Sequence, residues 1–199
     1  EMKTNTDPDS VAKMSKKEIK ELKAKTKEQR EGALAEAKIV RKAGEARLKN
    51  WNKATKEMLG FLTSLTVLDI SHNKLTELPR SIGHLRNLTE LNSCHNEVKL
   101  LPDTFVRLTN LVRLELQHNK LDALPDNMGR KMLDLEEMDV SHNNLQRLPA
   151  LDYSENNLRV VDASFNQLSR VPPIGPKMRH LNVSGNEKLN SWTKLNQAR

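Results

Sequence analysis

Leucine and isoleucine recur along the middle of the chain in a fixed order, broken by polar residues at fixed places. The stretch 65–79 carries leucine or isoleucine at 65, 68, 70, 75 and 78, an asparagine at 73 and a proline at 79. The same arrangement returns 23 residues later, and again 23 residues after that. A period in this range is typical of proteins that stack one structural unit many times. The pattern therefore predicts a solenoid.

The asparagine of each copy gives the alignment, at intervals of 23, 23, 24, 23 and 20 residues. The six are Asn73, Asn96, Asn119, Asn143, Asn166 and Asn186. Alternation along a short strand sends Leu68 and Ile70 inward, while Val67 and Asp69 face outward. Successive strands stack in parallel, so neighbouring coils are expected to share one leucine core. Each asparagine is expected to donate its amide to backbone carbonyls of its turn.

The repeated residues resemble intracellular leucine-rich-repeat proteins of the Ras-suppressor type, whose coil reads LxxLxxLxLxxNxLxxLPxxIxx. Segments 62–84 and 85–107 fit that frame, with Ser93 as the main departure, and the resemblance covers 62–186. It implies an α/β fold, a right-handed leucine-rich-repeat solenoid of about six coils with short parallel strands on its concave face. It also implies an intracellular scaffold that binds proteins and has no enzymatic activity.

The residues before the repeats have a different composition. From 11 to about 43 there is no proline, and alanine, glutamate, lysine and arginine abound, which predicts a long basic α-helix ending near Gly44. Ala46 to Met58 is interpreted as a degenerate coil that covers the open end of the solenoid. We divide the chain into a disordered start, a helical arm, a capping coil, the repeats and a tail or partial cap, at residues 1–10, 11–44, 45–61, 62–189 and 190–199.

Positive charge is concentrated at the N-terminal end. The chain has a net charge of +7, and residues 1–59 hold 16 Lys or Arg against 10 Asp or Glu. The candidate polyanion-binding residues of the arm are Lys13, Lys16, Lys17, Lys20, Lys23, Lys27 and Arg30. Their spacing of three to four residues suits contacts with phosphates or with an acidic protein surface. The alternative is a solvated helix with interspersed glutamates, and both interpretations remain open.

The outward strand positions predict a mildly acidic concave face. The candidate partner-binding residues there are Asp69, Glu90, Asn92, Arg113, Glu115, Glu137, Asp139, Asp162 and Asn182. Such a row suits a basic or hydrogen-bonding partner, because grooves of solenoids are their usual binding surfaces. The alternative is that aspartate and asparagine stand there because such repeats carry them by default.

Four histidines form a column just before the asparagines, at His72, His95, His118 and His142. A ladder of like residues is not a tetrahedral cage, so we predict no metal site. Cys94 is expected to face outward and His95 the other way, which disfavours a nucleophile. No catalytic or phosphate-binding motif appears, so we predict neither enzyme activity nor a cofactor. No run of residues is apolar enough for a membrane span, and no membrane or small-molecule partner is expected.

Two functional hypotheses follow. The first is a small structural subunit of a large intracellular assembly, such as a ciliary axoneme, with a cytoplasmic or cytoskeletal location. The second is a ribonucleoprotein subunit, such as one of an organellar ribosome, that binds rRNA through the arm. The organellar location would require a targeting segment that has been removed. The first residue, Glu1, is compatible with such removal.

Overall fold

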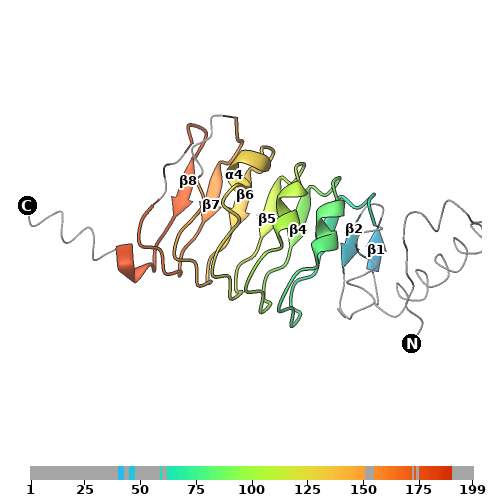
Figure 1. The fold of residues 1–199 in the computed structure, drawn as a ribbon, viewed down its shortest axis with the longest axis horizontal. Coiled ribbons are helices and arrows are strands. Elements are labelled where there is room, and N and C mark those ends of the chain that lie inside the picture. Colours follow the sequence, from blue (N-terminus) through green and yellow to red (C-terminus); the bar gives the residue numbers. More distant parts are fainter. Residues whose placement is uncertain are drawn as a thin grey trace, which may run out of the picture.

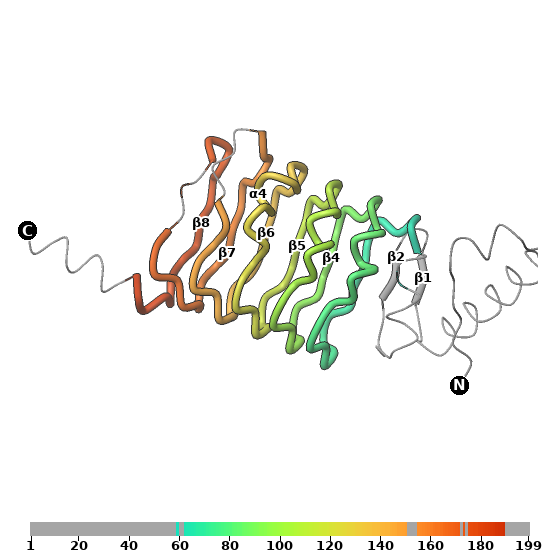
Figure 2. Tube along the Cα trace, viewed as in Figure 1, coloured from blue at the N-terminus to red at the C-terminus, as the bar shows by residue number. Residues whose placement is uncertain are grey.

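The computed structural model describes residues 40–42, 45–47, 59, 62–150, 155–171, 173 and 175–189. Over these residues the chain winds into a row of coils, and each coil adds one short strand to a single sheet (Figure 1). The Cα trace shows the coils following one another along the long axis of the described part (Figure 2). The solenoid that the leucine period predicts is therefore confirmed.

Six parallel strands form the body of the sheet, in the order of the sequence. They are β3 (Val67–Asp69), β4 (Glu90–Asn92), β5 (Arg113–Glu115), β6 (Glu137–Asp139), β7 (Val160–Asp162) and β8 (His180–Asn182). Their register pairs Leu68 with Leu91 and Leu91 with Leu114, which is the register expected from the asparagine alignment. Equivalent residues of all six coils consequently stand side by side.

The segments that return from one strand to the next carry short helical turns. These are η2 (Arg80–His84), η3 (Asp103–Arg107) and α4 (Met128–Lys131). Pro79 and Pro102 directly precede the first two turns with φ of −69° and −65°. Proline fixes φ near these values, so the leucine–proline pair sets the point where these two turns begin.

A continuous aliphatic core runs through the coils. The inward strand positions Leu68, Leu91 and Leu114 are buried almost completely, as the alternation predicts. Ser93 and Ala163 occupy weak inward slots and are equally buried. All belong to layers shared between neighbouring coils, so no single coil has a core of its own.

The asparagines of the repeat tie successive coils together. Asn143 donates its amide to its own coil at the carbonyl of Val140 (3.1 Å) and to the preceding coil at the carbonyl of Leu116 (3.0 Å). Its Oδ1 accepts the backbone N–H of Leu121 at 2.9 Å. The expected donation to the turn is confirmed. The bonds to the preceding coil are a further finding, since one buried side chain satisfies backbone groups of two coils.

The predicted C-terminal boundary of the helical arm, near Gly44, is wrong. β1 (Val40–Lys42) is a strand that pairs antiparallel with β2 (Glu45–Arg47), which in turn pairs parallel with β3. The backbone of β2 would otherwise offer unpaired groups at the edge of the sheet, and β1 covers that edge. Edge pairing therefore prevails over helix propensity in 40–42. The predicted helix over 11–39 lies outside the described residues.

The start of the sheet coincides with the predicted capping coil. Ala46 of β2 lies opposite Leu68 in the ladder, and Leu59 is buried against the core. Residues 48–58 of this coil lie outside the described residues. The predicted C-terminal tail, 190–199, lies outside them as well.

Candidate functional site: the strand face

The outward side chains of β3 to β8 form two rows, which together we name the strand face. The central row holds Asp69, Asn92, Glu115, Asp139, Asp162 and Asn182, and the flanking row includes Glu90, Arg113 and Glu137. All nine residues predicted for the concave face are thus brought together in register. The seven predicted for the arm, Lys13 to Arg30, lie outside the described residues.

Five of the six central side chains have a structural role in their own coil. In each, a side-chain oxygen accepts the backbone N–H two residues further along. Asp69 accepts from Ser71 at 3.0 Å, and Asp162 accepts from Ser164 at 2.9 Å. Asn92, Asp139 and Asn182 make the same bond. This hydrogen bond closes an Asx turn where the strand ends, which accounts for aspartate and asparagine at these positions without any partner.

Glu115 is the exception in the central row. Within the described part of the chain its carboxylate makes no hydrogen bond of this kind, because its side chain is one methylene longer than aspartate. Burial raises the pKa of Glu115, and the nearby carboxylates of Asp139, Asp69 and Glu90 act in the same direction against the lowering effect of Arg113. A carboxylate without a role in its own turn therefore lies at the centre of the face.

Asp162 shows what the turn does to a carboxyl group. Burial opposes its ionisation, but hydrogen bonds from the Ser164 hydroxyl and backbone and from the Asn182 amide outweigh burial, so its pKa lies below the ordinary value. The Ser164 hydroxyl lies 2.6 Å and the Asn182 amide 2.9 Å from the carboxylate. The aspartate charge is thus partly satisfied inside the molecule, in contrast to that of Glu115.

A shallow hollow of about 210 Å³ opens over the first coils of the strand face. It is lined by Val67, Leu68, Asp69, Glu90, Leu91, Asn92, Arg113 and Glu115. Arg113 is the one cation among these residues, and its guanidinium forms an ion pair with Glu137 at 2.9 Å. The surface of the hollow consequently offers mostly acceptors and negative charge.

A third row lies two residues after the central row and holds Ser71, Cys94, Gln117, Ser141, Ser164 and Ser184. Several of its side chains are less accessible than strand alternation predicts. Cys94, Ser141 and Ser164 are buried, because the chain turns at the next residue and packs these small side chains between the coils. Gln117 stands in the same row, and its Oε1 is a buried atom without a hydrogen-bond partner in the described part of the chain. Because the Gln117 oxygen is fully buried, a partner on the surface does not reach it. The half-buried carboxylate of Glu115 is the acceptor of this coil that its own turn leaves unused.

The histidine column is a continuous stack of rings. Centroids of successive rings from His72 to His142 lie 4.3–4.4 Å apart, and Phe165 extends the stack at 4.4 Å from His142. All five residues have a positive φ of 52–55°. A ring nitrogen of His95 lies within 4.8 Å of the Cys94 sulfur, so the prediction that the two side chains point in opposite directions is wrong. The reason is the left-handed backbone at His95, which ends the alternation of the strand.

His72, Cys94 and His95 together present three potential metal-ligand atoms within 4.8 Å of one another. The two imidazole rings are nearly parallel, with an angle of 11° between them, so their in-plane lone pairs do not converge on one point. Burial, followed by the charges of Glu115 and Asp69, raises the pKa of the Cys94 thiol. A raised pKa disfavours the thiolate that metals and electrophiles require. This geometry supports neither a metal centre nor a nucleophile.

Comparison with known proteins agrees with the leucine-rich repeats found in the sequence and the fold. The family description "Leucine-rich repeat region" matches residues 45–171, more than half of the chain. The chain belongs to the leucine-rich-repeat family. Proteins of this family generally mediate protein–protein interactions and are typically not enzymes. Among the described residues, no helix has the length and apolar character needed to cross a bilayer.

Two relatives illustrate the breadth of this family. A leucine-rich-repeat protein of Leptospira interrogans has a similar structure, with a TM-score of 0.53 and 29% identity over 62% of this chain and 36% of that one. The platelet glycoprotein Ib alpha chain of Mus musculus is 44% identical over 43 residues, which are 22% of this chain and 6% of the mouse protein. The chain thus spans about a third of the length of the first and a small fraction of the second.

Proposed function

We propose that this chain is a non-catalytic scaffold whose strand face receives a basic segment of a protein partner. The observation that carries the proposal is the carboxylate of Glu115, which lies at the centre of the face and does not serve its own turn. The nine predicted residues of the face include six carboxylates and one guanidinium. Burial is the main cause of the raised pKa of Glu115, and repulsion from Asp139, Asp69 and Glu90 adds to it. A positive side chain placed among these residues offsets the repulsion.

The choice of Glu115 follows from the turns around it. Asp139 and Asp162 hold backbone N–H groups, so replacing either one alters the coil as well as the charge of the face. Glu115 has no such bond. A lysine or arginine of the partner supplies a charged donor to its carboxylate.

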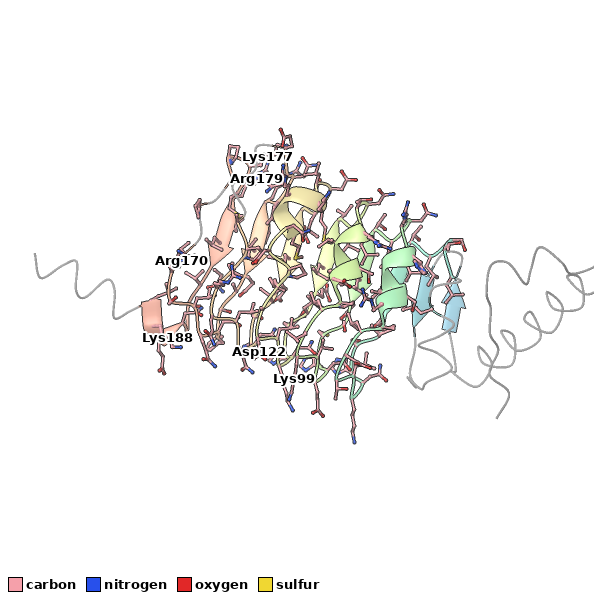
Figure 3. All side chains as sticks on the ribbon, viewed as in Figure 1. Lys99, Asp122, Arg170, Lys177, Arg179 and Lys188 are labelled. Atoms are coloured by element: carbon pink, nitrogen blue, oxygen red, sulfur yellow. The ribbon has the colours of Figure 1, made fainter. Side chains whose placement is uncertain are left out.

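Charge reversal at Glu115 tests this proposal. We expect Glu115→Lys to weaken recovery of the protein partner in co-purification about tenfold or more, because a favourable contact becomes a repulsive one. Asp122→Lys makes the same change of charge at an exposed site that is labelled at the lower edge of the coils in Figure 3. It is expected to leave recovery unchanged. Equal recovery with both variants, at equal unfolding midpoints, contradicts docking on the strand face.

The assembly that we propose is a large intracellular one, in which the chain is a small structural subunit. A ciliary axoneme suits the distribution of charge, since the arm carries the positive surplus of the chain and tubulin offers an acidic surface. In this arrangement Lys13, Lys16 and the other basic residues of the arm anchor the chain, and the strand face sets its position. The resemblance of the coil to the Ras-suppressor type supports a cytoplasmic or cytoskeletal location.

A ribonucleoprotein role is the second candidate, and the same basic arm favours it. Its lysines recur at three to four residues, a spacing that suits successive phosphates of RNA. Nuclease treatment of the purified assembly separates the two. Loss of the association after RNase treatment favours rRNA as the partner. Retention after RNase, together with loss at raised salt, favours an acidic protein surface.

A further inference from the structure

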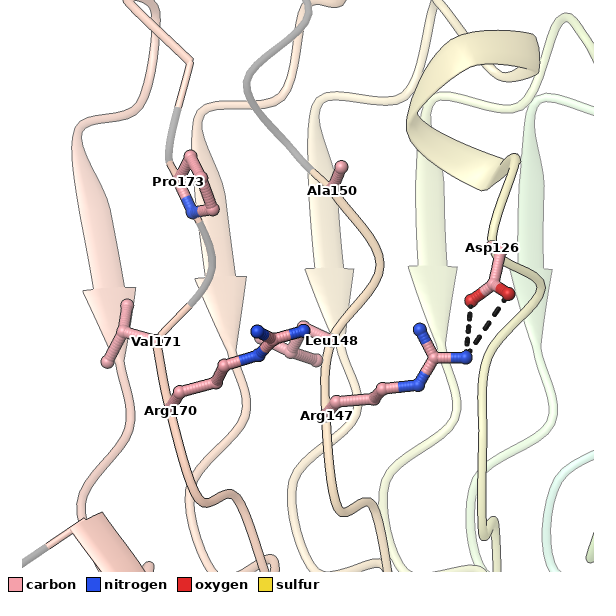
Figure 4. Close-up of a pocket in the computed structure, with 7 residues that line it drawn as sticks. All are labelled: Asp126, Arg147, Leu148, Ala150, Arg170, Val171 and Pro173. Carbon is pink, nitrogen blue, oxygen red and sulfur yellow. Dashed lines mark hydrogen bonds and ion pairs between the residues drawn. The ribbon is translucent and has the colours of Figure 1, made fainter.

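A second hollow, of about 380 Å³, opens away from the strand face, on the segments that follow the asparagines (Figure 4). Its lining residues are Asp126, Arg147, Leu148, Ala150, Arg170, Val171 and Pro173. Arg147 and Arg170 stand four residues after the asparagine of two successive coils, so the repeat places them side by side. The same slot holds Glu77, Leu100 and Ala123 in the three preceding coils. The arginine pair is therefore particular to these two coils.

Only one of the two guanidinium groups is paired with a carboxylate among the described residues. Arg147 binds Asp126, with Nη2 2.8 Å from one carboxylate oxygen and 3.1 Å from the other. The guanidinium of Arg170 lies beside Leu148 in Figure 4 and forms no ion pair or hydrogen bond within the described residues. The described lining residues thus carry two positive charges and one negative charge, and none of the described residues occupies the donors of Arg170.

Exposed apolar surface adjoins these charges. Val171 occupies the slot of the leucine that precedes proline in the other coils, where Leu124 and Leu148 are each 5% exposed. Val171 is 46% exposed, and it lines the hollow together with Pro173. A cationic group next to an open apolar patch suits a ligand that has an anion and an apolar group in adjacent positions.

We propose that this hollow binds an acidic side chain of a protein partner, with its carboxylate on Arg170 and a neighbouring apolar side chain against Val171 and Pro173. The count of charges decides between carboxylate and phosphate. One carboxylate neutralises the single positive charge that the two arginines and Asp126 leave. A phosphorylated residue carries nearly two negative charges at neutral pH and would leave an excess beside Asp126. The site is separate from the strand face, so neither proposal depends on the other.

Titration of the full chain with short peptides tests the proposal. The probe is a blocked tetrapeptide, glycine–glutamate–leucine–glycine, and its two companions have glutamine or phosphoserine in place of glutamate. Binding is followed by calorimetry and by the NMR signals of the arginine side chains. We expect saturable binding of the glutamate peptide and binding about tenfold weaker for the glutamine peptide, which lacks the charge-assisted hydrogen bonds.

Three variants locate the site. Arg170→Gln is expected to weaken binding of the glutamate peptide about tenfold. Arg107→Gln removes an exposed arginine of η3 outside the hollow and is expected to change nothing. Asp126→Asn removes the competing carboxylate, so it is expected to tighten binding several-fold. All three side chains are exposed, and equal unfolding midpoints verify that the fold is retained.

Four outcomes overturn the proposal. The first is no saturable binding of the glutamate peptide, and the second is equal binding of the glutamate and glutamine peptides. The third is an equal effect of Arg170→Gln and Arg107→Gln, which would make the attraction one of general charge. The fourth is tighter binding of the phosphoserine peptide than of the glutamate peptide, which would assign the hollow to phosphorylated partners instead.

Discussion

Glu115 and Asp162 occupy the same position in coils two apart, yet their carboxyl groups are shifted in opposite directions. Asp162 accepts hydrogen bonds from Ser164 and Asn182, and its pKa lies below the ordinary value despite burial. Glu115 has no such donors, and burial raises its pKa. One methylene group separates a side chain that closes its own turn from one that does not. The two residues therefore have opposite effects on the dependence of stability on pH.

The first prediction follows from this contrast. The folded-state pKa of Asp162 is lowered, so its ionised form stabilises the fold above the unfolded-state pKa, and this contribution is lost as the pH falls through the folded-state pKa. Asp162→Asn should lower the unfolding midpoint at neutral pH and have a smaller effect as the pH falls toward the folded-state pKa. The folded-state pKa of Glu115 is raised, so its ionisation opposes folding once the pH exceeds that pKa. Glu115→Gln should therefore raise the midpoint at neutral pH.

Denaturant unfolding at neutral pH and near pH 3 measures both effects. Near pH 3 the raised pKa of Glu115 leaves its carboxyl protonated, so Glu115→Gln should converge on the parent chain. The pKa of Asp162 is lowered, so the deficit of Asp162→Asn should become smaller in acid and vanish only below that pKa. Shifts of the same sign at neutral pH would show that the two carboxyls do not differ in the way that their hydrogen bonds indicate.

The second prediction concerns the asparagines between coils. Asn143→Ala removes the donor to Leu116 and Val140 and the acceptor for Leu121, and it leaves these buried backbone groups unpaired. We expect a loss of about 2–4 kcal/mol of unfolding free energy. Asn144→Ala is the matched control, because the next residue is exposed. Equal losses for the two variants in denaturant unfolding would contradict the role assigned to Asn143.

The third prediction tests the register of the strands. Leu114 is fully buried between coils, and Leu114→Ala should cost about 2–5 kcal/mol through the cavity that it leaves. Glu115→Ala changes the neighbouring outward side chain and should cost little, since no hydrogen bond of the turn depends on it. Similar losses of unfolding free energy for both variants would mean that the register of the strand is wrong by one residue.

The repeats could be predicted from the sequence because leucine and asparagine recur at one regular spacing. Asparagine spacing gives the register, and alternation then places Leu68 inside and Asp69 outside. The direction of His95 could not be found in this way, because alternation fails once the backbone becomes left-handed. Four of the five left-handed ring positions carry histidine, a residue enriched in that conformation, but this signal is weaker than the strand pattern.

The candidate site was predictable in position and only partly in character. The alignment places all nine residues on the outward side of the strands, whereas the turn-closing role of the aspartates depends on the backbone conformation after each strand. Glu115 could have been distinguished in advance, since it is the one glutamate in a row of aspartates and asparagines. The arginine pair at 147 and 170 also stands in one slot of the alignment. Its single counter-charge comes from Asp126 in the preceding coil, and the strand pattern contains no information about that contact.

The last prediction concerns the first strand and the arm before it. β1 pairs with β2 and covers the edge of the sheet, with Val40 opposite Arg47 and Lys42 opposite Glu45. Removal of residues 1–39 keeps this pair, so we expect a folded, monomeric solenoid that has lost the basic arm and no longer joins its assembly. Removal of residues 1–43 also deletes β1 and leaves the backbone of β2 unpaired. We expect this shorter chain to melt at a lower temperature and to associate with itself through the open edge. Thermal melts and size-exclusion chromatography of the two chains measure the difference. Identical behaviour would mean that β1 does not protect the edge, and continued assembly of the chain without residues 1–39 would exclude the arm as the anchor.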